Sequence, residues 1–251
     1  MKTKVIIPAY NEAHTIRRTL DSLPADLTEP IVAVNGEDDG TLAIAEQLGA
    51  EVLLSEEQGK IRAIQQALGY IGSSAALEPI LLLDADTQPI FARRWHDGMV
   101  DRLQSDDRPT SIGGPVIFTG KPAHEAVLRS VYRVYRTARH SQVDDTVHSV
   151  QFGPNMALKL HDSQTLDAIM ELPNYWPSED RAIAQTIIDQ GGSHQTPIHL
   201  SLATITPTSL SAVALRERIR HGSAGSVKLA EQRYIERSAP NTLAFRPHSE
   251  Q

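Results

Sequence analysis

The chain has 251 residues, of which 40% are hydrophobic and 22% charged, so it can bury one sizeable core and is not disordered by composition. Its formal net charge of −7 argues against general nucleic-acid binding, which depends on Lys and Arg side chains that neutralise phosphates. The absence of cysteine excludes disulfides, thiolate zinc sites and cysteine nucleophiles.

The N-terminal part of the chain alternates short apolar runs with helical periodicity. Uninterrupted apolar runs predict four strands, at residues 5–7, 31–34, 52–54 and 80–83. Between them, apolar side chains at helical spacing predict helices at residues 13–23, 42–48 and 61–71. This alternation is typical of an α/β fold, in which helices flank a mostly parallel sheet on both faces.

After about residue 105 the pattern changes. Strands are predicted at residues 111–118 and 152–160, and helices at 127–138, from Glu179 onward, and at 209–221. Because no linker marks a boundary, we predict a single domain at 1–235. Its halves are a nucleotide-binding half at 1–105 and an acceptor-side half at 106–235, and a loosely ordered tail follows at 236–251.

The sequence gives no sign of a membrane-spanning segment. No apolar run approaches the roughly 20 residues that cross a bilayer. The first residues lead directly into a strand rather than into a signal peptide. We expect a cytoplasmic protein that at most touches the inner face of the membrane.

Asp84 and Asp86 directly follow the apolar run at 80–83. Ligands of α/β sheets bind beyond the carboxyl ends of the strands. Two carboxylates one residue apart can share Mg²⁺ or Mn²⁺, and such an ion can stabilise a diphosphate as a leaving group. This pair also arises by chance in acidic loops, but its place after a buried strand favours a metal site. His194 and His199, near a predicted late strand, are either ordinary surface or core residues or candidates for a third ligand, and the first interpretation is favoured.

Glu179 and Asp180 open a predicted helix. They either cap the helix dipole or supply a general base, and on local grounds capping is favoured. Lys60, after Gly59, also stands at a helix start and could reach a phosphate, although the spacing of a P-loop is absent.

Two groups of arginines lie on predicted helices: Arg129, Arg133 and Arg136 on one, and Arg216, Arg218 and Arg220 on the other. The first interpretation is a solvated basic face. The second is contact with phosphates or with an anionic membrane surface.

Taken in chain order, these segments resemble the family 2 glycosyltransferases across residues 4–225. The matching segments are residues 5–12 and 35–41 as nucleotide-binding loops, 58–60 before the diphosphate-side helix, 84–86 as the metal-binding Asp-x-Asp, 153–157 beside the donor-sugar pocket, and 179–180 as the Glu-Asp pair. Because the pair falls where the family has its base, the catalytic interpretation now outweighs capping.

The resemblance implies a Rossmann-like GT-A fold and a full set of site residues. Asp84 and Asp86 would bind Mg²⁺ or Mn²⁺, Asp180 would be the catalytic base, and Glu179 would assist it. The residues that would contact the nucleotide sugar are Pro8, Ala9, Tyr10, Glu12, Asn35, Gly59, Lys60, Ala85 and Asn155.

Three positions depart from the family pattern. Val34 and Asn35 stand where many relatives have two acidic residues, one of which contacts uracil, so a guanosine donor is open beside uridine. His221 ends a segment that carries a tryptophan in processive members, which favours a non-processive enzyme. Arg181 follows the Glu-Asp pair in place of a further acidic residue.

The sequence therefore predicts an inverting, metal-dependent transfer of a sugar from a nucleotide to an unidentified acceptor hydroxyl. A phosphorylated or lipid-linked acceptor would give the arginine groups a purpose. One alternative is a nucleotidyltransferase that makes a sugar nucleotide, although residues 8–12 lack its glycine-rich loop. The other is a non-catalytic nucleotide-sugar-binding protein, although both the paired aspartates and Asp180 are present.

Overall fold

A computed structural model describes residues 2–36, 39–55, 57–72, 78–118, 155–174, 179–197 and 199–206. The described strands are β1 (Thr3–Ala9), β2 (Thr28–Asn35), β3 (Glu51–Ser55), β4 (Ile80–Leu83), β5 (Gln88–Pro89), β6 (Thr110–Gly113), β7 (Val116–Phe118), β8 (Asn155–Lys159), β9 (Ser193–Gln195) and β10 (Thr204–Thr206). The described helices are α1 (Ile16–Asp21), α2 (Thr41–Gln47), α3 (Lys60–Ile71), α4 (Ala92–Gln104), α6 (Ser163–Met170), α7 (Glu179–Asp189) and the 3₁₀-helix η2 (Leu200–Leu202).

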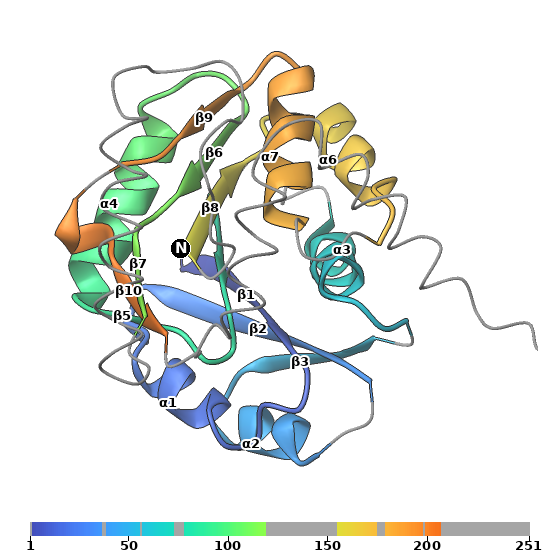
Figure 1. Cartoon of the computed structure of the whole chain (residues 1–251), viewed down its shortest axis with the longest axis vertical. Coiled ribbons are helices and arrows are strands. Elements are labelled where there is room, and N and C mark those ends of the chain that lie inside the picture. The colour runs from blue at the N-terminus through green and yellow to red at the C-terminus, as the bar shows by residue number, and fades with distance from the viewer. Residues whose placement is uncertain are drawn as a thin grey trace, which may run out of the picture.

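Within this part of the chain, seven strands form a sheet in the order β3-β2-β1-β4-β8-β6-β9, and β5, β10 and β7 form a small second sheet (Figure 1). Strands β1 to β4 are parallel, whereas β8 runs antiparallel between β4 and β6. The predicted α/β fold with a mostly parallel sheet is confirmed.

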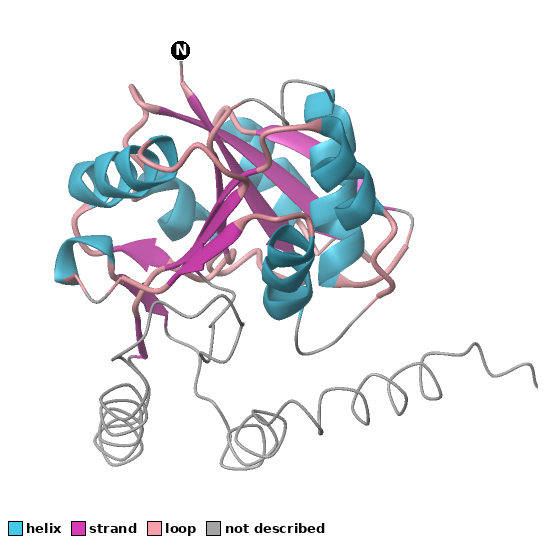
Figure 2. Cartoon of the chain, turned by 90° about the horizontal axis from the view of Figure 1, so that it is seen from above, coloured by secondary structure: helices cyan, strands magenta, loops and turns pink. Residues whose placement is uncertain are grey.

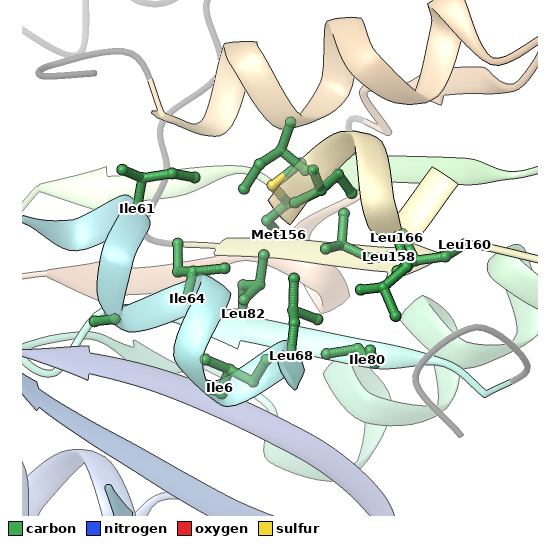
Figure 3. Packing of buried hydrophobic residues seen from close by; sticks show 14 of the residues in the cluster. Ile6, Ile61, Ile64, Leu68, Ile80, Leu82, Met156, Leu158, Leu160 and Leu166 are labelled. Atoms are coloured by element: carbon green, nitrogen blue, oxygen red, sulfur yellow. The ribbon is translucent and has the colours of Figure 1, made fainter. Parts of the chain in front are cut away.

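Helices cover both faces of the large sheet (Figures 1 and 2). In β4, Ile80 and Leu82 pack into a core cluster with α3, α6 and α7 (Figure 3). Leu81 and Leu83 point to the opposite face, into a cluster with α1, α2 and α4. Because both faces are buried, each residue of the strand must be apolar, which explains the uninterrupted run in the sequence.

The structure differs from the predicted elements in three places. The strand expected at 111–118 is broken by Gly114 and Pro115, so β6 joins the large sheet and β7 the small one. Pro115 has no N–H to donate to a continuing ladder. The helix expected at 13–23 is reduced to the six residues of α1. Helices α4 and α6 were not predicted, since each carries only a short apolar stripe among polar residues.

Several predictions lie outside the described residues: the helices at 127–138 and 209–221 with their arginines, and the tail at 236–251. The division into halves and tail therefore remains a prediction. Among the residues that are described, no helix is both long and apolar enough to cross a membrane.

Candidate active site

The loops after β1, β2 and β4 meet at one edge of the sheet. Ile6 pairs with Leu82, and Ala9 pairs with Val34, so the carboxyl ends of the three parallel strands lie level with one another. Pro8 consequently lines the same pocket as Asp84. This is the edge where the sequence predicted the nucleotide and the metal.

Lys60, the first residue of α3, joins two acidic side chains from distant parts of the chain. Its Nζ lies 2.6 Å from Asp84 Oδ1 and 2.9 Å from Glu179 Oε1. Burial lowers the pKa of Lys60, but the two carboxylates raise it more, and the pKa ends above its ordinary value. Lys60 therefore remains a cation that ties the end of β4 to the start of α7.

The acidic pair that opens α7 faces this cluster. Glu179 and Asp180 are each only 6% exposed. Together with Lys60 and Asp84 they line one pocket of about 250 Å³, its open mouth included. A cap at a helix terminus needs no burial, and a buried carboxylate is costly unless a partner or ligand compensates for its charge. The placement thus brings the predicted base and the first predicted metal ligand into one pocket.

The second predicted metal ligand, Asp86, is fixed by hydroxyl groups. Its Oδ1 accepts a hydrogen bond from Thr87 Oγ1 at 3.1 Å, and its Oδ2 accepts one from Thr206 Oγ1 at 3.1 Å. The intervening Ala85 is buried, and its carbonyl accepts a hydrogen bond from Thr19 Oγ1 at 2.7 Å. The backbone of the Asp-x-Asp turn is therefore anchored to α1.

The residues at this edge fit a divalent cation. Burial raises the pKa of Glu12, and the negative charges of Asp86 and Asp84 add to that rise, which indicates an excess of negative charge. No group of three potential ligands gathers among the residues that the structure describes. Mg²⁺ commonly takes one or two carboxylates and completes its shell with water and substrate phosphates, so Asp84 and Asp86 would be enough to hold it beside a bound diphosphate.

Neither candidate histidine lies with the aspartates. His194 belongs to β9, which β6 and β8 separate from β4, and its Nδ1 lies 2.7 Å from Ser111 Oγ. Burial lowers the pKa of His194 to about 4, so it is a neutral core residue at pH 7. His199 is exposed, and its Nδ1 lies 2.5 Å from Ser201 Oγ.

Asp39, which sequence reasoning did not single out, connects the loops after β1 and β2. Its Oδ2 accepts a hydrogen bond from Ala13 N at 3.1 Å, and its Oδ1 accepts one from Thr41 N at 3.1 Å. Glu12 N in turn donates to Thr41 Oγ1 at 3.0 Å. The signal in the sequence was an aspartate two residues before the first residue of a helix, a common turn-forming position.

Tyr10 offers a flat surface beside these loops. It is 52% exposed, and its ring lies so close to Gly36 that a Cβ there would be 2.6 Å from Tyr10 Cε2. Asn35 is buried at the end of β2, immediately before Gly36. The glycine thus leaves room for an exposed aromatic ring at the expected nucleotide position.

The side chain of Asn155 is held by protein groups. Its side chain is fully buried, where Oδ1 accepts from Trp95 Nε1 at 2.8 Å and Nδ2 donates to the carbonyls of Pro115 at 3.0 Å and Leu202 at 2.7 Å. Both amide hydrogens and the carbonyl are thereby engaged with protein. The side chain thereby joins α4, β8 and the segments before β7 and β10, and the role of Asn155 at the donor site stays a prediction.

Contacts within the protein explain why a glycine stands at position 59. Its φ of +124° favours glycine, and a Cβ there would lie 2.2 Å from Asn174 Oδ1. The Asn174 side chain donates a hydrogen bond to Gln58 O at 2.7 Å. The segment after α6 is therefore packed onto the loop that opens α3.

Comparison with known proteins agrees with this geometry. Residues 4–162 match the family described as glycosyl transferase family 2. The described fold is similar to the crystal structure of glucosyl-3-phosphoglycerate synthase from Mycobacterium tuberculosis with Mn²⁺, UDP-glucose and phosphoglyceric acid, with a TM-score of 0.55 and 18% identity over 92% of this chain and 80% of that chain. A structure of that synthase with UDP gives a TM-score of 0.54 and 19% identity, with the same coverage.

Two curated glycosyltransferases of Haloferax volcanii are similar over part of the sequence. AglE is 34% identical over 125 residues, which are 46% of this chain and 39% of AglE. AglD is 49% identical over 128 residues, which are 45% of this chain and 19% of AglD. This chain thus matches well under half the length of either relative. The family match and the shared GT-A fold confirm the resemblance found in the sequence: the chain belongs to glycosyl transferase family 2.

Proposed function

We propose that the chain transfers a sugar from a nucleoside diphosphate sugar to an acceptor hydroxyl by a single, inverting and non-processive displacement that requires Mg²⁺ or Mn²⁺. The observation that carries the proposal is the pocket itself. Asp84 at the end of β4 and Asp180 at the start of α7 are 96 positions apart in the sequence, yet both line it. Lys60 lines it too and pairs with Asp84 and with Glu179, the neighbour of Asp180.

In this proposal the leaving group and the nucleophile would lie on opposite sides of the bound sugar. Asp84 and Asp86 would hold a cation that neutralises charge on the departing diphosphate. Lys60 would contribute a second positive charge on the same side. Asp180 would take the proton of the acceptor hydroxyl as its oxygen bonds to the anomeric carbon, and Glu179, held by Lys60, would keep the start of α7 in position. The sugar–phosphate bond would break with its electrons on the diphosphate. Because the acceptor oxygen would attack the anomeric carbon from the opposite face in the same step, the configuration would invert.

The nucleotide would lie across the loops after β1 and β2. Tyr10 offers an exposed ring on which a base can stack, and Asn35 stands at the place where the base edge would be read. Pro8, Ala9, Glu12, Gly59 and Ala85 would line the rest of the donor site. Both uridine and guanosine remain candidates for the base, because Asn35 offers an amide where many relatives have a carboxylate.

The acceptor would be phosphorylated or lipid-linked, with contacts from the arginine groups near residues 133 and 216 and peripheral contact with the membrane. Arg133→Glu and Arg216→Glu should then weaken both acceptor affinity and association with anionic liposomes. Unchanged values for both properties would remove this part of the proposal. The Mn²⁺, UDP-glucose and phosphoglyceric acid bound by the mycobacterial synthase are compatible with such chemistry, although at 18% identity that likeness shows the fold alone.

The base assignment is tested by Asp180→Asn. Its donor is first found by a thermal-shift screen of nucleotide sugars with Mn²⁺, and turnover is then followed as release of nucleoside diphosphate by transfer to water. We expect donor affinity to be kept and turnover to fall about 10²–10⁴-fold. Asp189→Asn, at the exposed far end of α7, changes the same group on the same helix and should leave turnover unchanged. Native turnover in Asp180→Asn would refute the assignment.

A further inference from the structure

Asp86 receives hydrogen bonds from two threonines that come from different parts of the chain. Thr87 is its neighbour, but Thr206 is 120 positions away, in β10 of the small sheet. Thr206 is 1% exposed. A buried hydroxyl therefore donates to the carboxylate of Asp86, which is itself only partly buried.

The strand that carries Thr206 is itself fixed at several points. Thr204 N donates to Pro115 O at 3.0 Å, and Asn155 Nδ2 donates to Leu202 O at 2.7 Å. Strand β10 also pairs with β5 on one side and β7 on the other. Thr206 thus presents its hydroxyl from a strand that is fixed on both sides, and the hydrogen bond from Asn155 helps to fix it.

A hydroxyl donor affects a carboxylate differently from a cation. It orients the group and occupies one lone pair, but it leaves the negative charge and the other lone pairs available to a metal. Asp84 is instead paired with the cationic Lys60 at 2.6 Å. From this we infer that Thr206 is a positioning residue for Asp86 and sets the affinity of the site for Mn²⁺. The inference rests on the metal role of Asp86 in the proposed function.

Strand β10 supplies its own control. Thr204 lies two positions earlier, on the same face of the strand, and is 0% exposed. Its Oγ1 has no hydrogen-bond partner among the residues that the structure describes. Thr206→Val and Thr204→Val are the same isosteric change in the same strand, and only the first removes a hydrogen bond to Asp86.

The experiment titrates Mn²⁺ into each protein in the presence of UDP and, separately, GDP, and follows free Mn²⁺ by electron paramagnetic resonance. Thr206→Val should weaken Mn²⁺ affinity about 10–100-fold, the usual loss when a hydrogen-bond partner of a metal ligand is removed. Thr206→Ser keeps the hydroxyl and should retain near-native affinity, as should Thr204→Val. A melting temperature for each variant shows that it is folded, and Thr206→Ala replaces Thr206→Val if the valine does not fit.

Three results would overturn the inference. The first is native Mn²⁺ affinity in Thr206→Val, and the second is an equal loss in Thr206→Val and Thr204→Val, which would show a packing effect. The third is a loss in Thr206→Ser as large as in Thr206→Val. If the wild-type protein binds no Mn²⁺ with either nucleotide, the metal role in the proposed function fails first, and the two failures are thereby distinguished.

Discussion

Lys60→Met isolates the charge that joins the two sides of the pocket. The change leaves Asp84 and Glu179 without their shared cation, while methionine keeps most of the volume of the side chain. Removal of one partner of a fully buried ion pair costs about 3–5 kcal/mol, and an exposed pair contributes less than about 1 kcal/mol. The side chains of Lys60 and Asp84 are each 25% exposed and that of Glu179 is 8% exposed. We therefore expect a loss of about 2 kcal/mol in the free energy of unfolding.

The assay is thermal unfolding, with urea denaturation as a second measurement. A loss of about 2 kcal/mol lowers the melting temperature of a protein of this size by about 4–8 °C. Mn²⁺ should raise the melting temperature of Lys60→Met more than that of the wild type, because Lys60 no longer competes for Asp84. Lys4→Met is the matched control, since Lys4 lies 2.6 Å from Glu29 with similar lysine exposure (26%) but with a partner that is 51% exposed. The reasoning is refuted if Lys60→Met is no less stable than Lys4→Met, or if Mn²⁺ stabilises it no more than the wild type.

Three further predictions concern stability. Gly59→Ala should lower the free energy of unfolding by about 2 kcal/mol, because the φ of Gly59 is positive and the new Cβ would contact Asn174. Gly69→Ala, within α3, should raise the free energy of unfolding by about 0.5–1 kcal/mol. Urea denaturation measures both changes, and equal effects of the two substitutions would contradict the account. Burial holds the pKa of His194 at about 4 in the folded protein, against an ordinary 6.5, so between these pH values the unfolded chain binds one proton more than the folded protein. The contribution of His194 to the free energy of unfolding is therefore complete above pH 6.5 and falls by about 3 kcal/mol as the pH drops to 4. A stability–pH slope in that range that is unchanged in His194→Gln would exclude this residue as the cause. Asn155→Ala should lower the free energy of unfolding, measured by chemical denaturation, by about 3 kcal/mol. The substitution leaves three buried groups without their hydrogen bonds: the indole N–H of Trp95 and the carbonyls of Pro115 and Leu202. A loss under about 1 kcal/mol would show that these groups find other partners.

The central strands could be predicted because consecutive residues in the sequence determine them. A strand covered on both faces must be apolar at every position, and the runs at 31–34 and 80–83 coincide with β2 and β4. The edge where ligands bind follows from the parallel order of these strands, which is why Asp84 was predicted near the loop after β1. Pro115 could have signalled the break between β6 and β7, but the apolar residues around it suggested one continuous strand.

The contacts that orient the site could not be predicted, because they join residues that are distant in the sequence. Thr206 and Asn174 are of types common on any surface, and no periodicity marks the carboxylate or carbonyl that each one contacts. Asn155 shows the same limit of sequence reasoning. The resemblance located its segment correctly beside β4, but it could not show that the side chain points into the core.

Calorimetric titration of the donor nucleotide sugar, with and without Mn²⁺, tests the central claim most directly when wild type, Asp86→Ala and Asp180→Asn are compared. The account predicts that wild type and Asp180→Asn bind the donor in a Mn²⁺-dependent way, and that Asp86→Ala loses this dependence together with most of the affinity. Donor binding that is equally tight in Asp86→Ala, or equally tight without the metal, would contradict it.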